Sequence, residues 1–147
     1  MDMEDIIQEK ISADHLLYVS LKYTKTCDVI MNLLLRWRKM IDTCIIHILE
    51  DAKKQGKIKE VSDNAIGRIT EMKNLLKKDD NAIKTIDFFM MLRKIESLKT
   101  ERIGEFRKNV NLKVIFRGEE ININLEKLKE YADMLEKFID MTKKRLE

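Results

Sequence analysis

The clearest periodic pattern in the chain lies between residues 29 and 55. Apolar residues recur there at spacings of three and four, which indicates one face of an α-helix. Further apolar side chains lie off that face, so the apolar surface is wide. Such a helix is either central in a bundle or shared with a second subunit. The residues of the main stripe are Ile30, Leu33, Leu34, Trp37, Ile41, Cys44, Ile45, Ile48 and Ala52.

Short polar segments bound this central helix. Hydroxyl groups within residues 23–26 can cap its N-terminus, and Gly56 stands where a left-handed residue would end it. Upstream, apolar spacing predicts a helix that runs to about Tyr23. Ser12 is either the N-cap of that helix or a kink within a longer one.

Two helices are expected after the central one. The first begins at Ser62 or Asp63, and the polar segment 79–81 ends it and can cap its successor. That successor is predicted from Ala82 to Phe106, because apolar residues recur throughout the segment. Its Phe-Phe-Met-Met-Leu run at 88–92 is apolar on too many faces for a simple surface helix.

The period then changes from helical to alternating. Residues 112–116 and 121–123 are predicted to form two strands around Gly118. A lone hairpin is marginal in water, so it must pack on the bundle or pair with another edge. Asn124 can cap a closing helix. The predicted fold class is therefore mostly α: an antiparallel bundle of four to five helices, with one β-hairpin at about residues 111–124 before the C-terminal helix.

Length and composition fit one domain covering residues 1–147, since the chain shows no repeat and no linker. No apolar run reaches the ~18 residues of a transmembrane helix, and the acidic N-terminus lacks the basic start of a signal peptide. We therefore expect a cytoplasmic protein with no membrane partner. Abundant Lys, Glu and Ile with few Gln resembles thermophile composition, although an AT-rich genome gives the same bias.

The net charge of +3 is unevenly distributed. Residues 51–117 carry 17 basic and 10 acidic side chains, a net +7, whereas the segments on either side each carry 6 and 8, a net −2. Such asymmetry can mark a polyanion-binding surface, but a solvated face with neighbouring counter-charges is more common. The candidate polyanion-binding residues are Lys53, Lys54, Lys57, Lys59, Arg93, Lys99, Arg102, Arg107 and Lys108.

Side chains suited to catalysis are few. Cys44 and His47 could share a metal ion, but no second pair completes a site, so neither a metal nor another cofactor is expected. Cys27 and Cys44 would lie about 25 Å apart on one helix, which favours buried thiols over a disulfide. Nucleophile and phosphate-binding glycine motifs are absent, so an enzyme is the less favoured interpretation. One candidate polar cluster remains, Asp14, His15, Tyr18 and Tyr23.

Two resemblances bear on the fold. The stretch Ala-Asp-His-Leu-Leu-Tyr-Val-Ser-Leu-Lys-Tyr-Thr at 13–24 resembles small uncharacterised helical proteins of archaea, and Leu-Glu-Lys-Leu-Lys-Glu-Tyr at 125–131 is similar to their C-terminal ends. This resemblance covers most of the chain and implies no activity. More loosely, the bundle resembles HEPN domains, whose ribonuclease members carry an Arg, four to six further residues and then a His. The corresponding positions before His47 hold Met40, Ile41 and Asp42, so the ribonuclease motif fails here.

These features favour a non-enzymatic interaction module that forms a homodimer or binds a protein partner through apolar surface. The wide stripe of residues 29–55 and the run at 88–92 motivate this prediction. The alternative is an RNA-binding or HEPN-like toxin–antitoxin-type module that uses the basic segment 51–117. An enzyme built on the polar cluster would require its four residues to share a pocket.

Overall fold

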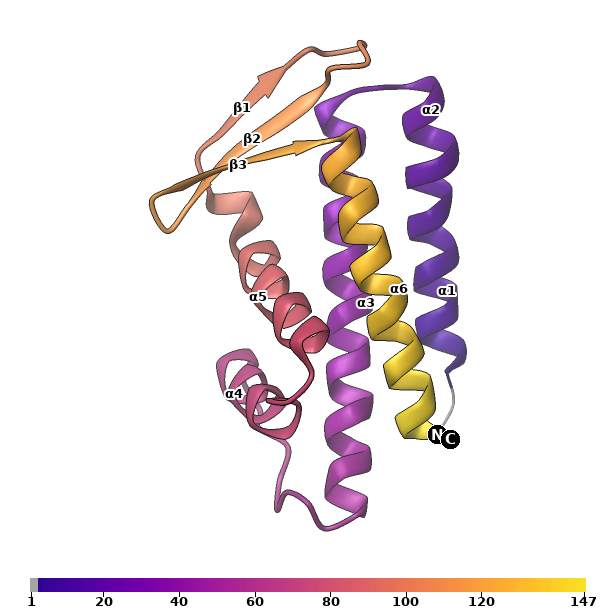
Figure 1. Cartoon of the computed structure of the whole chain (residues 1–147), viewed down its shortest axis with the longest axis vertical. Helices are drawn as coiled ribbons and strands as arrows, with labels where there is room; N and C mark the ends of the chain where they lie inside the picture. Colours follow the sequence, from indigo (N-terminus) through magenta and orange to yellow (C-terminus); the bar gives the residue numbers. More distant parts are fainter. Residues whose placement is uncertain (1–2) are drawn as a thin grey trace.

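The computed structural model describes residues 3–147 and is organised around one long helix, α3 (Cys27–Lys54) (Figure 1). The Thr26 hydroxyl accepts a hydrogen bond from the Val29 amide at 3.3 Å, so the predicted cap in segment 23–26 is confirmed. Gly56 follows the helix with a φ of 74°, as a residue that ends a helix in the left-handed region does. All nine residues of the predicted stripe are buried.

The N-terminal segment is a single helix over residues 4–23, called here the first helix. It consists of α1 (Glu4–His15), a π-helical turn η1 (Leu16–Ser20) and α2 (Leu21–Tyr23), with helical backbone at both junctions. The interpretation of Ser12 as an N-cap is therefore wrong. Ile6 is completely buried, and this packing extends the helix upstream of Ser12.

The helix after the central one, α4 (Ala65–Leu75), begins slightly later than predicted. Its N-cap is Asn64, whose side-chain oxygen accepts a hydrogen bond from the Gly67 amide at 2.7 Å. The carbonyl groups of Ser62 and Asp63 instead accept hydrogen bonds from a side chain of α4, so neither residue starts the helix.

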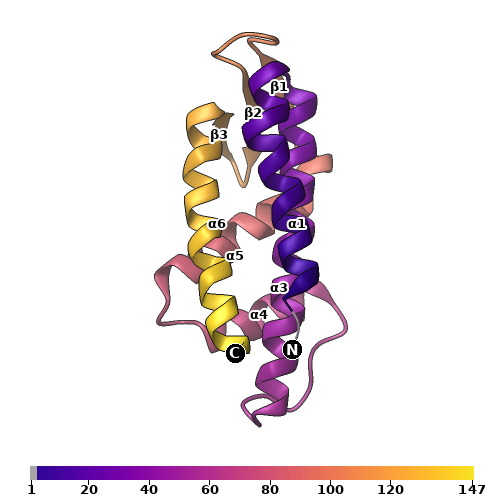
Figure 2. The ribbon, with the colours of Figure 1, turned by 90° about the vertical axis from the view of Figure 1, so that its right-hand side faces the viewer.

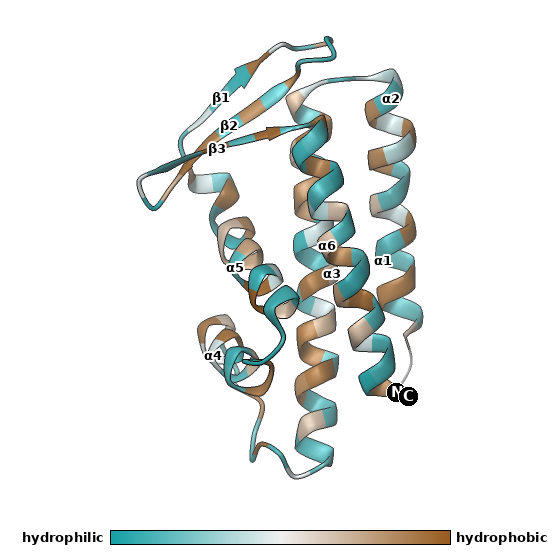
Figure 3. Cartoon of the chain, viewed as in Figure 1, coloured by the Kyte–Doolittle hydropathy of each residue, from teal (hydrophilic) through white to brown (hydrophobic). Residues whose placement is uncertain are grey.

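Two further helices begin at the predicted caps. Asp79 accepts a hydrogen bond from the Ala82 amide at the start of α5 (Asp80–Lys94). Asn124 accepts one from the Lys127 amide at the start of α6 (Leu125–Leu146). Helices α1, α4, α5 and α6 all contact α3, so its wide apolar surface is explained by a central position within the chain. Figure 3 shows apolar residues on several turns of α3 below the part that α6 overlaps in this view.

The predicted helix from Ala82 to Phe106 is too long. The α-helix ends at Lys94, a 3₁₀ turn η2 follows (Ile95–Ser97), and the chain then forms a strand, β1 (Thr100–Ile103). Gly104 follows β1 with a φ of 67°, which a helix could not accommodate. A glycine inside a helix also costs about 1 kcal/mol relative to alanine, which favours an earlier end.

The predicted hairpin is confirmed as β2 (Asn111–Phe116) and β3 (Glu119–Asn124), and β1 adds a third strand to give the antiparallel order β1-β2-β3. Leu112 pairs with Ile123 and Val114 with Ile121, as the alternation indicates. Arg117 and Gly118 both have positive φ, which is the pattern of a type I′ turn.

The sheet covers one end of the bundle, where α3 begins and α6 begins (Figure 1). Leu112, Val114 and Ile123 are buried and join the same core as the helices. The hairpin is therefore stabilised by the bundle and by a third strand. Among residues 3–147, no helix is both long and apolar enough to span a membrane.

Candidate interaction surface

Large apolar side chains that remain exposed are concentrated on the first helix. Five of the seven such side chains in residues 3–147 belong to it, namely Ile7, Ile11, Tyr18, Val19 and Tyr23. The other two, Ile66 and Phe106, lie on α4 and in the loop after β1. We call Ile7, Ile11, Tyr18 and Val19 the outer face of the first helix. Exposed apolar side chains scattered singly are ordinary, but a group of them on one element marks a contact surface.

The first helix is apolar on two sides. Its inner residues Ile6, Ala13, Leu17 and Leu21 are buried in the core shared with α3, while the outer face points to solvent. A helix that only covers a core needs one apolar stripe. The second stripe is therefore not required by the fold of this chain.

The π-helical turn at residues 16–20 shapes the outer face. A π turn takes one more residue than an α turn, so it shifts which side chains point inward. Here Leu17 and Leu21 are both buried, while Tyr18 and Val19 are both exposed. Single π turns inside α-helices occur frequently at functional sites.

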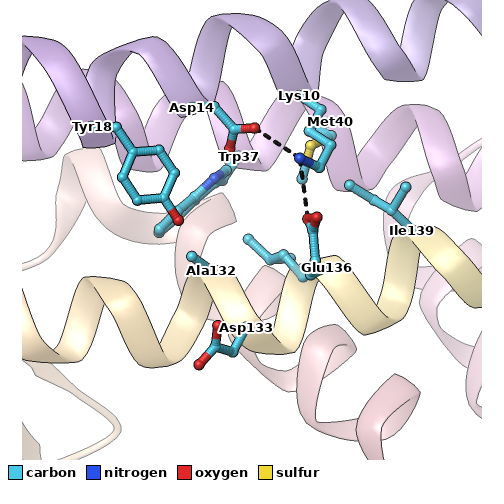
Figure 4. Close-up of a pocket in the computed structure, with 10 residues that line it drawn as sticks. Lys10, Asp14, Tyr18, Trp37, Met40, Ala132, Asp133, Glu136 and Ile139 are labelled. Atoms are coloured by element: carbon cyan, nitrogen blue, oxygen red, sulfur yellow. Dashed lines mark hydrogen bonds and ion pairs between the residues drawn. The ribbon is translucent and has the colours of Figure 1, made fainter.

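A groove adjoins the outer face, between the first helix and α6, on the side of the molecule that Figure 2 shows. Its volume is about 350 Å³. Trp37 and Met40 of α3 are buried beneath it, and Ala132 and Ile139 line it from α6 (Figure 4). The groove thus combines an apolar base with a polar rim.

Lys10 bridges this groove. Its Nζ lies 2.7 Å from Oδ2 of Asp14 on the same helix and 3.1 Å from Oε2 of Glu136 on α6 (Figure 4). Burial lowers the pKa of Lys10, but the two carboxylates outweigh this effect and raise its pKa above the ordinary value. Lys10 is therefore a cation that holds the rims of the groove together.

The predicted polar cluster is divided by the structure. Asp14 and Tyr18 line the groove, whereas His15 and Tyr23 do not. His15 is exposed, and Tyr23 is 79% exposed with the Lys22 ammonium 5.9 Å from its ring centroid. The groove therefore brings together two of the four residues of the predicted cluster, Asp14 and Tyr18.

The predicted polyanion-binding residues lie at opposite ends of the molecule. Arg102 forms an ion pair with Asp28 at the start of α3, whereas Lys53 and Lys54 are in its last turn. The 25 residues between Asp28 and Lys53 span about 37 Å of helix. Lys57 and Lys59 are close in sequence to Lys53 and Lys54, whereas Lys99, Arg107 and Lys108 are close to β1. The two sets do not form one surface, and RNA binding by segment 51–117 stays a prediction.

One predicted residue, Arg93, belongs to a different group. It lines a groove with Arg38, Lys39 and Arg68, none of which the sequence analysis selected. The signal was the run Arg-Trp-Arg-Lys at 36–39, which places cations on both sides of the buried Trp37. The net charge of each segment could not reveal this group. Two of its members, Arg38 and Lys39, lie on α3 in the acidic first third of the chain.

The two cysteines are buried and free, which confirms the interpretation as buried thiols. Burial raises the pKa of Cys44 to about 12 and that of Cys27 to about 11. His47 lies with its Nε2 2.8 Å from Oδ2 of Asp5. Residues 3–147 contain no group of three or more His, Cys, Asp or Glu arranged to hold a metal ion.

The fold is thus a helical bundle closed at one end by a three-stranded antiparallel sheet, with an unpartnered apolar face on its first helix. No family model matches the chain, and neither a curated protein nor a solved structure matches it. The resemblances to archaeal helical proteins and to HEPN domains therefore stay predictions.

Proposed function

We propose that this protein is a non-enzymatic interaction module that forms a homodimer through the outer face of its first helix. The observation that supports this proposal is the concentration of five of the seven exposed large apolar side chains on that helix. Burying them against a second copy removes apolar area from water, which is the main driving force of association.

This surface differs from the one predicted from the sequence, which was the wide stripe of residues 29–55 and the run at 88–92. The stripe of α3 is buried within the chain, as are Phe88, Phe89, Met91 and Leu92 of the apolar run. These residues therefore need no partner. The outer face of the first helix is the apolar surface that the fold leaves uncovered.

Charge along the first helix favours a second copy as the occupant. The first turn is acidic, with Glu4 and Asp5, and the other end carries Lys22 and Lys25. A two-fold axis pairs the helix with itself in antiparallel orientation, so the acidic end of each copy lies beside the basic end of the other. In this pairing, the numbers of two residues that face each other across the two copies add up to about 26. Ile7 of one copy therefore lies opposite Val19 of the other, and Ile11 lies near the two-fold axis.

The expected dimer is weak. A single helix face lies at the small end of specific interfaces, where association is reversible, so we expect a dissociation constant on the order of micromolar. The groove bridged by Lys10 runs beside this face and can receive side chains of the partner helix. Opposite charges at the two ends set the register rather than the affinity.

The outer face has a matched control elsewhere on the chain. Ile11 is 56% exposed on the first helix, and Ile66 is 58% exposed on α4. Replacing either one with Glu adds the same charge at a position of equal exposure. Ile11→Glu places two carboxylates near the two-fold axis, so it should weaken the dimer at least tenfold, whereas Ile66→Glu should leave the dissociation constant unchanged.

Sedimentation velocity over a concentration series measures both variants against the unmodified protein, and circular dichroism checks that each variant folds. Equal association of all three proteins would contradict the proposed surface. Equal weakening by both substitutions would show that net charge, and not the outer face, controls association.

A further inference from the structure

A second groove, of about 490 Å³, lies between α3, α4 and α5. Four cationic side chains line it together with one carboxylate, that of Asp42. The cations are Arg38, Lys39, Arg68 and Arg93. We propose that this groove, called here the arginine groove, is a binding site for a small organic phosphate.

Arg68 is held in place by the backbone. Its Nη1 donates hydrogen bonds to the carbonyl oxygens of Ser62 and Asp63 at 3.2 and 3.0 Å. The Asp42 carboxylate lies 4.0 Å from its Nη2, at the outer limit of an ion pair. The guanidinium is thus fixed by neutral groups, which orient it without removing its charge. Its side chain is only 17% exposed, so this charge acts in a partly desolvated position.

Arg38 and Arg93 supply further positive charge from the two neighbouring helices. Arg38 donates through Nη1 to the Leu92 carbonyl oxygen at 3.3 Å and to Glu96 at 2.9 Å. The guanidinium of Arg93 forms no hydrogen bond or ion pair with residues 3–147. Lys39 pairs with Glu9, but its side chain is 67% exposed and can turn toward the groove. Four cations and one carboxylate line the groove, and Glu96 and Glu9 pair with two of the cations from outside it, so the group carries a net +1.

Arg93 is the cation of this group that no carboxylate pairs, so its charge favours a bound anion. Like charges gathered in one concavity repel each other, and the repulsion is strongest where apolar walls exclude water. Leu35 and Phe89 form such walls here. A bound anion relieves the repulsion, and the same focusing of positive potential raises its local concentration.

The chemistry of the lining favours phosphate over carboxylate. Guanidinium groups present paired N–H donors that match phosphate oxygens, and a phosphate carries up to two charges where a carboxylate carries one. The apolar walls suit the organic part of a phosphate ester. The groove is lined by α3, α4 and α5, and the first helix reaches it only through the ion pair of Glu9 with Lys39 (Figure 1). None of the residues that line it belongs to the outer face of the first helix, so the site does not depend on dimerisation.

A titration followed by ¹H–¹⁵N NMR tests the site, with pyrophosphate and ATP as probes at low salt. We expect saturable shifts at the backbone amides of residues 35–42, 65–68 and 89–93. Arg93→Gln removes the one lining arginine without a partner and should weaken binding about tenfold. The control Arg107→Gln removes an equal charge from an exposed arginine near β1 and should leave binding unchanged.

A single-stranded RNA oligonucleotide forms the second arm of this experiment. Tighter binding of RNA than of ATP, with shifts spread over both ends of the molecule, would assign the phosphate chemistry to a polymer and overturn the proposal. Equal loss in Arg93→Gln and Arg107→Gln would show unspecific attraction, and no saturable shift at millimolar probe would show that the groove binds no phosphate. Either result would also overturn the proposal.

Discussion

Gly104 directly follows β1 and turns the chain into the loop that leads to β2. Its φ is 67°, and a Cβ added there would lie 2.8 Å from the Asn109 carbonyl oxygen. Gly118 also has positive φ, but a Cβ there would meet nothing within 4 Å. The two glycines therefore separate the cost of backbone conformation from the cost of a steric clash.

Alanine substitution at these glycines gives the first prediction. Gly118→Ala should lower the free energy of unfolding by about 1 kcal/mol, because only the left-handed conformation is penalised. Gly104→Ala should lower it by about 2–3 kcal/mol, because the clash with the Asn109 backbone adds strain. Urea denaturation measures both values. Equal losses would mean that the loop after β1 relaxes freely around the added methyl group.

Cys44 couples stability to pH. Burial raises the pKa of its thiol from 9.0 to about 12. Between these values the thiol ionises in the unfolded chain but not in the folded one, so the unfolded state binds fewer protons. The resulting contribution to stability is complete below about pH 9 and is lost as the pH rises towards 12.

The Cys44→Val variant isolates this contribution, since all other titrating groups are shared with the unmodified protein. As the pH rises above 9, the unmodified protein should lose stability relative to the variant, because only the unmodified protein carries the thiol. The difference between their free energies of unfolding should change by at most about 1.4 kcal/mol per pH unit. Denaturation at pH 8 and pH 10 gives the two differences. A difference that does not change with pH would contradict burial of the thiol.

Helix caps were predictable at the level of the element because they are local. Asp79 and Asn124 have a short polar side chain directly before an apolar period, and both cap a helix. The end of α5 was not predictable in the same way. Apolar spacing continues past Lys94, and the strand forms because β2 offers a pairing edge that is distant in sequence.

Asn124 therefore carries a prediction about α6. Its side-chain oxygen accepts a hydrogen bond from the Lys127 amide at 2.8 Å. Asn124→Ala removes this cap and should therefore destabilise the protein by about 1 kcal/mol. Asn32 is exposed inside α3, and Asn32→Ala should be neutral or slightly stabilising, because alanine has the higher helix propensity. Thermal unfolding compares the two variants. A loss of stability in both would indicate that Asn124 acts through something other than capping.

At the scale of the whole molecule, the sequence predicted the fold class but not the surfaces. Periodicity shows that α3 is apolar on several sides, yet it cannot tell burial within the chain from burial between chains. The outer face of the first helix was missed because Ile7 and Ile11 continue an ordinary apolar pattern. Their exposure depends on where α3 and α6 lie, which is tertiary information.

The same limit applies to charge. The basic segment 51–117 is distributed over both ends of the molecule, while the arginine groove combines residues of α3, α4 and α5. Net charge per segment ignores which helices become neighbours. Arg93 was selected for its segment, but its neighbours in space, Arg38 and Arg68, come from two other helices.

The proposed dimer joins two copies of this chain through the outer face of the first helix. Sedimentation velocity of the unmodified protein, from about 1 to 500 µM, tests it most directly. A reversible dimer gives a mass that rises from 17.5 kDa towards twice that value across this range. A mass of 17.5 kDa at every concentration would contradict it.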